Sequence, residues 1–175
     1  MSHYRPIAHL IALYPSSATR TAVKWLELRI PPPVVALIFA GAMAVCARAL
    51  PMLSVPFPRH GALAFAAALL GFGIDVVAVV SFLQARTTIN PTTPDATRSL
   101  VTSGVYSITR NPMYVGLTLL LTAWGLYLSN AFALGLVAGF VTYLTHYQIR
   151  PEERILREKF GPGYDNYTRR VRRWI

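Results

Sequence analysis

Charged residues and cysteine are both scarce in this chain. Only 14% of its 175 residues are charged, whereas about a quarter are charged in an ordinary soluble domain. The single cysteine, Cys46, excludes a disulfide framework and a cysteine-based metal site, and the four scattered histidines have no ligand spacing. Gly71-Phe72-Gly73 lies inside an apolar run rather than between a strand and a helix. The sequence therefore predicts no metal site and no dinucleotide-binding fold.

Long apolar runs make up much of the chain, in which 54% of residues are hydrophobic. Four runs could cross a membrane: residues 31–50, 61–85, 113–128 and 131–147. About 20 residues of helix match a hydrocarbon core of roughly 30 Å. The last two runs are separated only by Ser129-Asn130, so they must be antiparallel neighbours. We predict an all-α, polytopic membrane helical bundle of about four spans, with a C-terminal helical hairpin.

The length permits one integral membrane domain over residues 1–175. Residues 1–30 are expected to lie on the membrane surface or in the cytoplasm, because the apolar stretch near the N-terminus contains His9 and is short for a signal peptide. Residues 31–99 hold the first two spans and their connecting loop, and residues 100–175 hold the chemistry. After the hairpin, a cytoplasmic C-terminal helix should begin near Pro151 and break at Gly161-Pro162-Gly163.

The net charge of +10 is distributed unevenly. All but two of the 17 lysines and arginines lie in the terminal segments or the central loop, and the exceptions are Arg48 and Arg59. This bias predicts that both termini are cytoplasmic. Basic residues beside apolar runs favour membrane lipids, not nucleic acid, as partners. The small size and the absence of a eukaryotic retention signal favour a bacterial inner membrane.

Asp75 is the one acidic residue inside an apolar run. A carboxylate at the centre of a span costs about 2.5 to 3.5 kcal/mol on insertion scales, so it should face the bundle interior or a wet cavity. Two interpretations remain open: a structural hydrogen-bond partner for a neighbouring helix, or a residue that lines a cavity.

Two polar clusters should meet at one membrane face, because the hairpin returns the chain to the same side. The first is Arg110-Asn111-Pro112-Met113-Tyr114-Val115-Gly116, in which proline suits a helix N-terminus and Gly116 leaves room for another group to approach the backbone. The second is Arg150-Pro151-Glu152-Glu153-Arg154-Ile155-Leu156, which follows the fourth run. Adjacent carboxylates beside arginines at a membrane interface indicate a site.

These clusters resemble the motifs of the isoprenylcysteine carboxyl methyltransferase and phospholipid methyltransferase superfamily of integral membrane enzymes. A third motif, Phe160-Gly161-Pro162-Gly163-Tyr164-Asp165-Asn166-Tyr167, and the basic ending Val171-Arg172-Arg173 strengthen the resemblance, which covers roughly residues 100–175. Asn111 stands where eukaryotic members commonly have histidine, so no imidazole chemistry is assigned there. Membrane sterol reductases, which bind NADPH, look similar in this region but are far longer. A non-catalytic lipid-binding protein is the other alternative.

The resemblance implies S-adenosylmethionine as cofactor and a lipophilic or lipid-anchored methyl acceptor. It implies roles in catalysis for Arg150 and Glu153. The residues implied in cofactor binding are Arg110, Asn111, Tyr114, Gly116, Glu152, Glu153, Tyr164 and Tyr167. Tyr106 and His146 are two further candidates for cofactor binding, because they lie close to these motifs in the sequence. A carboxylate and aromatic faces suit a sulfonium donor, and Arg150 suits the carboxylate of the cofactor or an acidic substrate group.

Simpler interpretations exist for several of these residues. Arg110 could be a topology anchor, the two glutamates could serve the helix dipole, the tyrosines could form an interfacial belt, and His146 could simply end a helix. Because an amine or a thiol must lose a proton and no base is evident, carboxylate O-methylation is slightly favoured over N- or S-methylation of a phospholipid or small thiol. We also predict that Glu153 faces the pocket while Glu152, rotated by about 100°, faces the headgroup side.

Overall fold

The computed structural model describes residues 27–55, 58–84 and 100–175. Our expectations for the N-terminal segment and the central loop fall largely outside these residues. The described elements are, in chain order, α2 (Pro32–Ala49), the short η2 (Pro51–Leu53), α3 (His60–Gln84), the short η4 (Gly104–Ser107), α4 (Pro112–Leu128), α5 (Ala131–Leu144), the π-helical turn η5 (Thr145–Ile149), α6 (Arg150–Phe160) and α7 (Pro162–Arg170). These residues contain two isolated bridges and no strand, so the predicted all-α bundle is confirmed.

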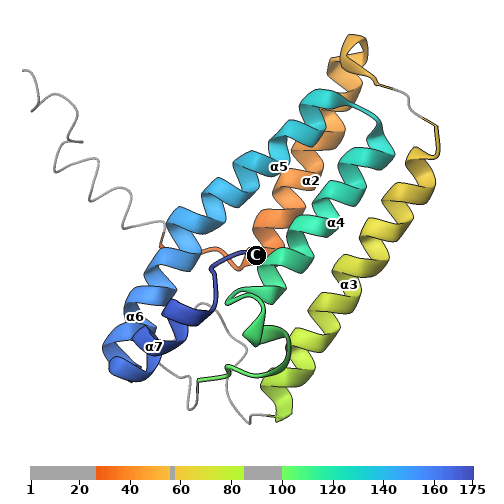
Figure 1. Ribbon diagram of the computed structural model, residues 1–175. Helices are drawn as coiled ribbons and strands as arrows, with labels where there is room; N and C mark the ends of the chain where they lie inside the picture. Colours follow the sequence, from red (N-terminus) through yellow and green to blue (C-terminus); the bar gives the residue numbers. More distant parts are fainter. Residues whose placement is uncertain (1–26, 56–57, 85–99) are drawn as a thin grey trace, which may run out of the picture.

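The four long apolar helices α2, α3, α4 and α5 lie side by side (Figure 1). In the described part of the chain, α2, α3 and the rod formed by α5, η5 and α6 are long and apolar enough to cross a membrane. Helix α4 is apolar too but has 17 residues, which gives about 25 Å at 1.5 Å per residue. Large apolar side chains such as Leu37 and Phe65 are more than 70% exposed, as expected for surfaces that face lipid.

Prolines begin several of these helices. Pro32, Pro112, Pro151 and Pro162 occupy the first or second position of α2, α4, α6 and α7, where the missing N–H has no helical partner to lose. The turn of the hairpin is made by Ser129, with a φ of 50°, and by the residue after it. This arrangement places the polar N-terminus of α4 at the end of the bundle where α5 finishes.

Asn130 fixes the hairpin to α2. Its side-chain oxygen accepts a hydrogen bond from the N–H of Ala133 at 3.0 Å, and its amide donates to the Leu50 carbonyl at 2.9 Å. The side chain is almost fully buried, so both bonds are protected from solvent. The interior of the bundle is apolar and includes Met43, Phe140 and Leu144.

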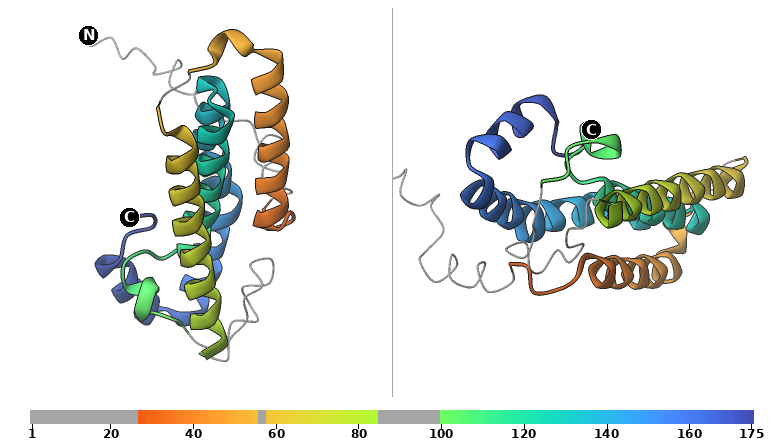
Figure 2. Two further views of the ribbon diagram at one scale, coloured as in Figure 1. Left: turned by 90° about the vertical axis from the view of Figure 1, so that its right-hand side faces the viewer. Right: turned by 90° about the horizontal axis from the view of Figure 1, so that it is seen from below.

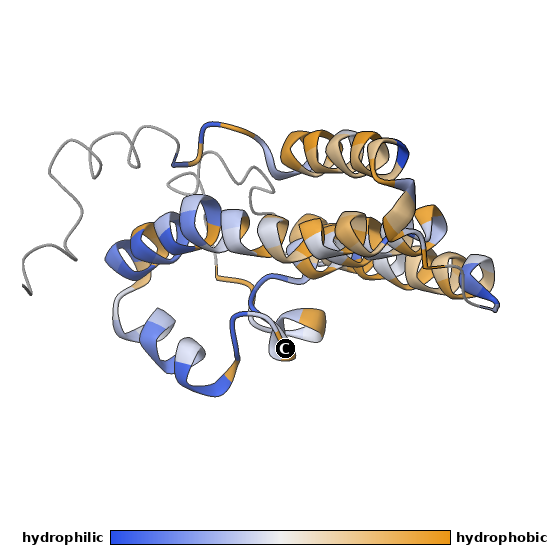
Figure 3. Ribbon diagram, turned by 90° about the horizontal axis from the view of Figure 1, so that it is seen from above, coloured by the Kyte–Doolittle hydropathy of each residue, from blue (hydrophilic) through white to orange (hydrophobic). Residues whose placement is uncertain are grey.

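Helix α5 passes without interruption through η5 into α6, and the character of its surface changes there. The four long helices are mainly apolar, whereas α6, α7 and the chain end are mainly hydrophilic (Figure 3). The predicted break of the last helix is confirmed, because α6 ends at Phe160 and α7 begins at Pro162. The residue between them, Gly161, has a φ of 50°, a conformation that glycine adopts without strain.

The turn at Gly161 brings α7 back toward the segment that enters α4 (Figure 2). Tyr164, Tyr167 and Val171 form a small second core, packed against Leu100, Leu156 and Phe160. This core holds the end of the chain, residues 171–175, beside the bundle. We call these five residues the C-terminal strap.

Candidate functional site

The C-terminal strap is bound to the polypeptide just before α4. The N–H of Arg110 donates to the Arg172 carbonyl at 3.0 Å. The Asn111 side-chain amide donates to the Arg173 carbonyl at 2.8 Å, and the Thr109 hydroxyl donates to the same oxygen at 3.3 Å. These contacts hold the backbone of the strap at both Arg172 and Arg173. The two residues therefore differ mainly in the direction of their side chains.

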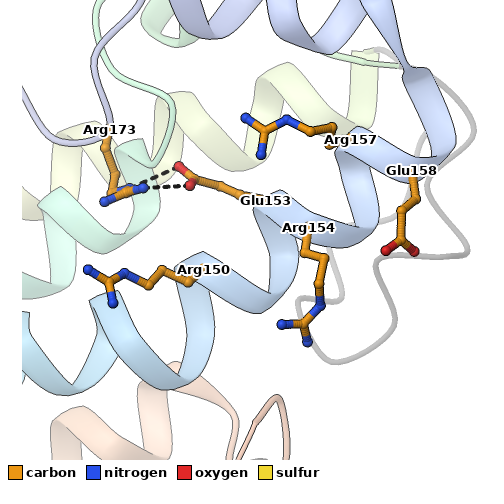
Figure 4. Close-up of a pocket in the computed structure, with 6 residues that line it drawn as sticks. All are labelled: Arg150, Glu153, Arg154, Arg157, Glu158 and Arg173. Carbon is orange, nitrogen blue, oxygen red and sulfur yellow. Dashed lines mark hydrogen bonds and ion pairs between the residues drawn. The ribbon is translucent and has the colours of Figure 1, made fainter. Parts of the chain in front are cut away.

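Glu153 is the centre of the polar site. Its Oε1 lies 3.0 Å from Nη2 of Arg110, and Arg173 binds both carboxylate oxygens at 2.9 and 2.7 Å (Figure 4). The Glu153 side chain is 12% exposed. The predicted meeting of the two polar clusters is therefore confirmed, and a single carboxylate carries two guanidinium groups. Bidentate pairs of this type are among the stronger hydrogen bonds in proteins.

The predicted direction of Glu152 is wrong. Glu152 does not face the headgroup side, because the Tyr114 hydroxyl donates to its Oε1 at 2.6 Å and the Gln148 amide donates to the same oxygen at 2.7 Å. The first turn of α6 is enclosed on two sides, by α4 and by the C-terminal strap. Two neighbouring side chains about 100° apart can therefore both contact protein.

Three predicted tyrosines lie close together near the strap. The Tyr167 hydroxyl donates to the Tyr106 carbonyl at 2.7 Å, and burial raises the pKa of Tyr167 to about 12, so it remains a donor at neutral pH. The Tyr164 and Tyr167 rings meet edge to face, and the Arg157 guanidinium lies 5.8 Å from the Tyr164 ring centroid, within cation–π range. Both α7 tyrosines are at most 4% exposed. Their contacts hold α7 against the segment before α4.

Gly116 lies against α3, and its hollow contains the Asp75 carboxylate. A Cβ at Gly116 would overlap both oxygens of that carboxylate. Oδ1 of Asp75 is buried and has no hydrogen-bond partner among the described residues. The room that the sequence predicted beside Gly116 is therefore taken by a side chain of the neighbouring span. Close packing continues one turn away, where a Cβ at Gly71 would lie 2.8 Å from the Gly116 carbonyl oxygen.

A cavity of about 390 Å³ opens beside Glu153. Its lining residues are Arg150, Glu153, Arg154, Arg157, Glu158 and Arg173 (Figure 4). Arg154 is paired with Glu27 at 2.6 Å and Arg157 with Asp165 at 2.8 Å. Arg150 has no ion pair among the described residues, and it extends from α6 in the same direction as Glu153, whereas Arg154 points away. The lining of the cavity thus contains two carboxylates and four guanidinium groups.

Of the predicted site residues, Arg150 and Glu153 line the cavity, and Arg110 contacts it through Glu153. His146 is not brought to this cavity: it is exposed, and its Nδ1 lies 2.9 Å from the Thr142 carbonyl of its own helix. Arg173 and Gln148 are site residues that the sequence did not single out. Among the described residues, no group of three His, Cys, Asp or Glu side chains could hold a metal ion.

The bundle and its polar cavity place this chain among polytopic helical membrane proteins. Its charged site lies at one end of the hairpin formed by α4 and α5. The chain matches the family described as phospholipid methyltransferase over residues 60–163, more than half of its length, and it belongs to this family. The predicted superfamily is thereby confirmed. Membership makes the chain a membrane methyltransferase for lipid-like substrates. The match ends before the C-terminal strap.

Among curated proteins, the chain is similar to one from Haemophilus influenzae that is described as uncharacterized. The two are 44% identical over 64 residues, which cover 36% of this chain and all of the relative. No solved structure matches this chain.

Proposed function

We propose that this protein uses S-adenosylmethionine to methylate a lipophilic or lipid-anchored acceptor that reaches the site from the bilayer. The main support is the Glu153 carboxylate, which lies between Arg110 and Arg173 at the edge of a cavity of about 390 Å³. The residues fit the cofactor, because a carboxylate suits its cationic groups and guanidinium groups suit its carboxylate. When bound, the cofactor supplies an electrophilic methyl group carried on a sulfonium.

The residues around this carboxylate would act mainly by binding and positioning. Glu153 would hold a cationic group of the cofactor, and Arg110 would keep the Glu153 side chain oriented through its ion pair. Arg150 would bind the cofactor's carboxylate or an acidic group of the acceptor. The bond from Tyr114 to Glu152 ties the start of α6 to α4, and Gln148 of η5 donates to the same Glu152 oxygen. This restraint matters because methyl transfer depends on alignment and on exclusion of water.

The remaining predicted residues lie around the site and would contribute through packing and hydrogen bonds. We propose that Asn111 serves through the strap, because its amide binds the Arg173 carbonyl. Tyr106, Tyr164 and Tyr167 would close the site through their packing, and Gly116 would contribute through its packing with Asp75. The contacts of His146 give no support to its predicted role in cofactor binding.

The first acceptor to test is a carboxylate, since it needs no base and Arg150 could bind it. The second is the amine of a phospholipid, because the family is described as phospholipid methyltransferase. Incubation with methyl-labelled S-adenosylmethionine and a panel of carboxylate, amine and thiol lipids should label one class. Release of the label by mild base identifies an ester. Calorimetry in detergent should also detect cofactor binding at micromolar levels, and a folded sample that binds neither the cofactor nor its demethylated product would contradict the proposal.

We further propose that both termini face the cytoplasm, on the basis of the distribution of basic residues, and that the membrane is a bacterial inner membrane, on the basis of the small size of the chain. The polar surfaces of α6, α7 and the strap would then lie on the cytoplasmic side. A reporter that is active only in the cytoplasm should be active when fused to the C-terminus. Activity of the periplasmic reporter alone would reverse the orientation.

A further inference from the structure

Two guanidinium groups of the protein itself already occupy the Glu153 carboxylate. Arg110 forms an ion pair with Oε1 at 3.0 Å, and Arg173 donates two hydrogen bonds, while an ionised carboxylate has about four acceptor directions. A cationic group of a ligand can therefore form a close ion pair with this carboxylate only if the guanidinium of one of the two arginines moves away. The identity of the arginine that moves determines which guanidinium is then available to bind another group of the cofactor.

Arg173 is better placed to move than Arg110. The Arg173 side chain is 33% exposed and lines the cavity, whereas that of Arg110 is 12% exposed. The backbone of Arg173 is held through its carbonyl oxygen by Asn111 and Thr109. The guanidinium can therefore swing about its own side chain while the C-terminal strap stays bound.

The amino-acid end of S-adenosylmethionine carries an ammonium and a carboxylate on one carbon, so it has the charge pattern of the Glu153–Arg173 pair in reverse. We propose that Arg173 is a cofactor-binding residue that exchanges partners: the cofactor's ammonium replaces it at Glu153, and its guanidinium pairs with the cofactor's carboxylate. No covalent bond forms or breaks in this exchange. The Glu153 carboxylate and the Arg173 guanidinium each remain paired with an opposite charge. Arg150 is then left for the acceptor. This inference rests on the proposed use of S-adenosylmethionine.

The exchange can be tested by binding, without any measurement of turnover. Two ligands are compared by calorimetry on the full chain in detergent: S-adenosylmethionine, and decarboxylated S-adenosylmethionine, which keeps the amine and the sulfonium but lacks the carboxylate. Arg173→Gln should weaken binding of the first by about tenfold or more. It should leave binding of the second unchanged or make it tighter, because Glu153 is then easier to reach. Arg173→Lys, which keeps the charge but not the two-pronged contact, should give a smaller selective loss.

Arg172→Gln is the matched control, because Arg172 lies in the same strap, is exposed and does not line the cavity. It should bind both ligands as wild type does. If Arg173→Gln weakens the binding of both ligands equally, Arg173 has a purely structural role and the inference is overturned. The inference is also overturned if Arg173→Gln leaves both affinities unchanged, or if Arg150→Gln instead selectively weakens the binding of S-adenosylmethionine. Wild-type protein that binds neither ligand would overturn the proposed function itself, so the two failures are distinguishable.

Discussion

A Glu153→Gln variant should bind S-adenosylmethionine about tenfold to more than a hundredfold more weakly than wild type and should transfer methyl groups more slowly. Glutamine keeps the shape of the side chain but removes its charge, and a charge-assisted hydrogen bond contributes about 1.5 to 3 kcal/mol. The change also leaves Arg110, whose side chain is 12% exposed, without its carboxylate partner. Calorimetric affinity measured in detergent is the direct test.

Glu152→Gln is the matched control, and it should cost clearly less. Glu152 accepts both of its hydrogen bonds, from Tyr114 and Gln148, through a single oxygen, and the carbonyl oxygen of glutamine can accept the same two bonds. Thermal unfolding of both variants separates weaker binding from weaker folding. If Glu153→Gln binds the cofactor as wild type while Glu152→Gln does not, the carboxylate assigned to the cofactor is the wrong one.

Gly116→Ala should destabilise the bundle strongly. The added methyl group would overlap the Asp75 carboxylate, and overpacking of a tight contact costs about 1 to 3 kcal/mol. The contact joins α3 to α4 close to the polar cluster, so the thermal midpoint in detergent should fall. Asp75→Ala removes the carboxylate that the methyl group meets, so the double variant Asp75→Ala/Gly116→Ala should recover much of the loss.

Gly73→Ala provides the comparison in α3, because nothing lies within 4 Å of a Cβ added there. It should not lower the midpoint, since alanine is the better helix former. If Gly116→Ala unfolds at the wild-type temperature, or if Asp75→Ala gives no recovery, these two side chains do not share the space that the structure assigns to them.

The order of the helices and their ends were predictable because they depend on local sequence. Pro112 and Pro151 mark helix starts through a missing N–H, and Gly161 marks a break through its positive φ. The short Ser129-Asn130 turn required an antiparallel hairpin, which in turn brought Arg110 close to Glu153. The family motifs stand on either side of that hairpin, so the centre of the candidate site was predictable too.

The directions of individual side chains were not predictable in the same way. A helical repeat says how far Glu152 is rotated from Glu153, but not that protein surrounds the first turn of α6 on both sides. Residues 169–173 contain four arginines, and the sequence alone does not indicate that Arg173 is the one that contacts Glu153. That choice depends on the Tyr164 and Tyr167 packing that positions the strap, which involves residues more than sixty positions apart in the chain.

The sequence by itself determined that this is an all-α membrane protein of the methyltransferase superfamily, because hydropathy, prolines and short motifs are local properties that do not depend on distant contacts. Only the tertiary structure decided that Asp75 occupies the hollow of Gly116, that Glu152 turns toward Tyr114 and that Arg173 holds Glu153. Each of these contacts joins different elements, and the geometry that makes it exists only once those elements have packed.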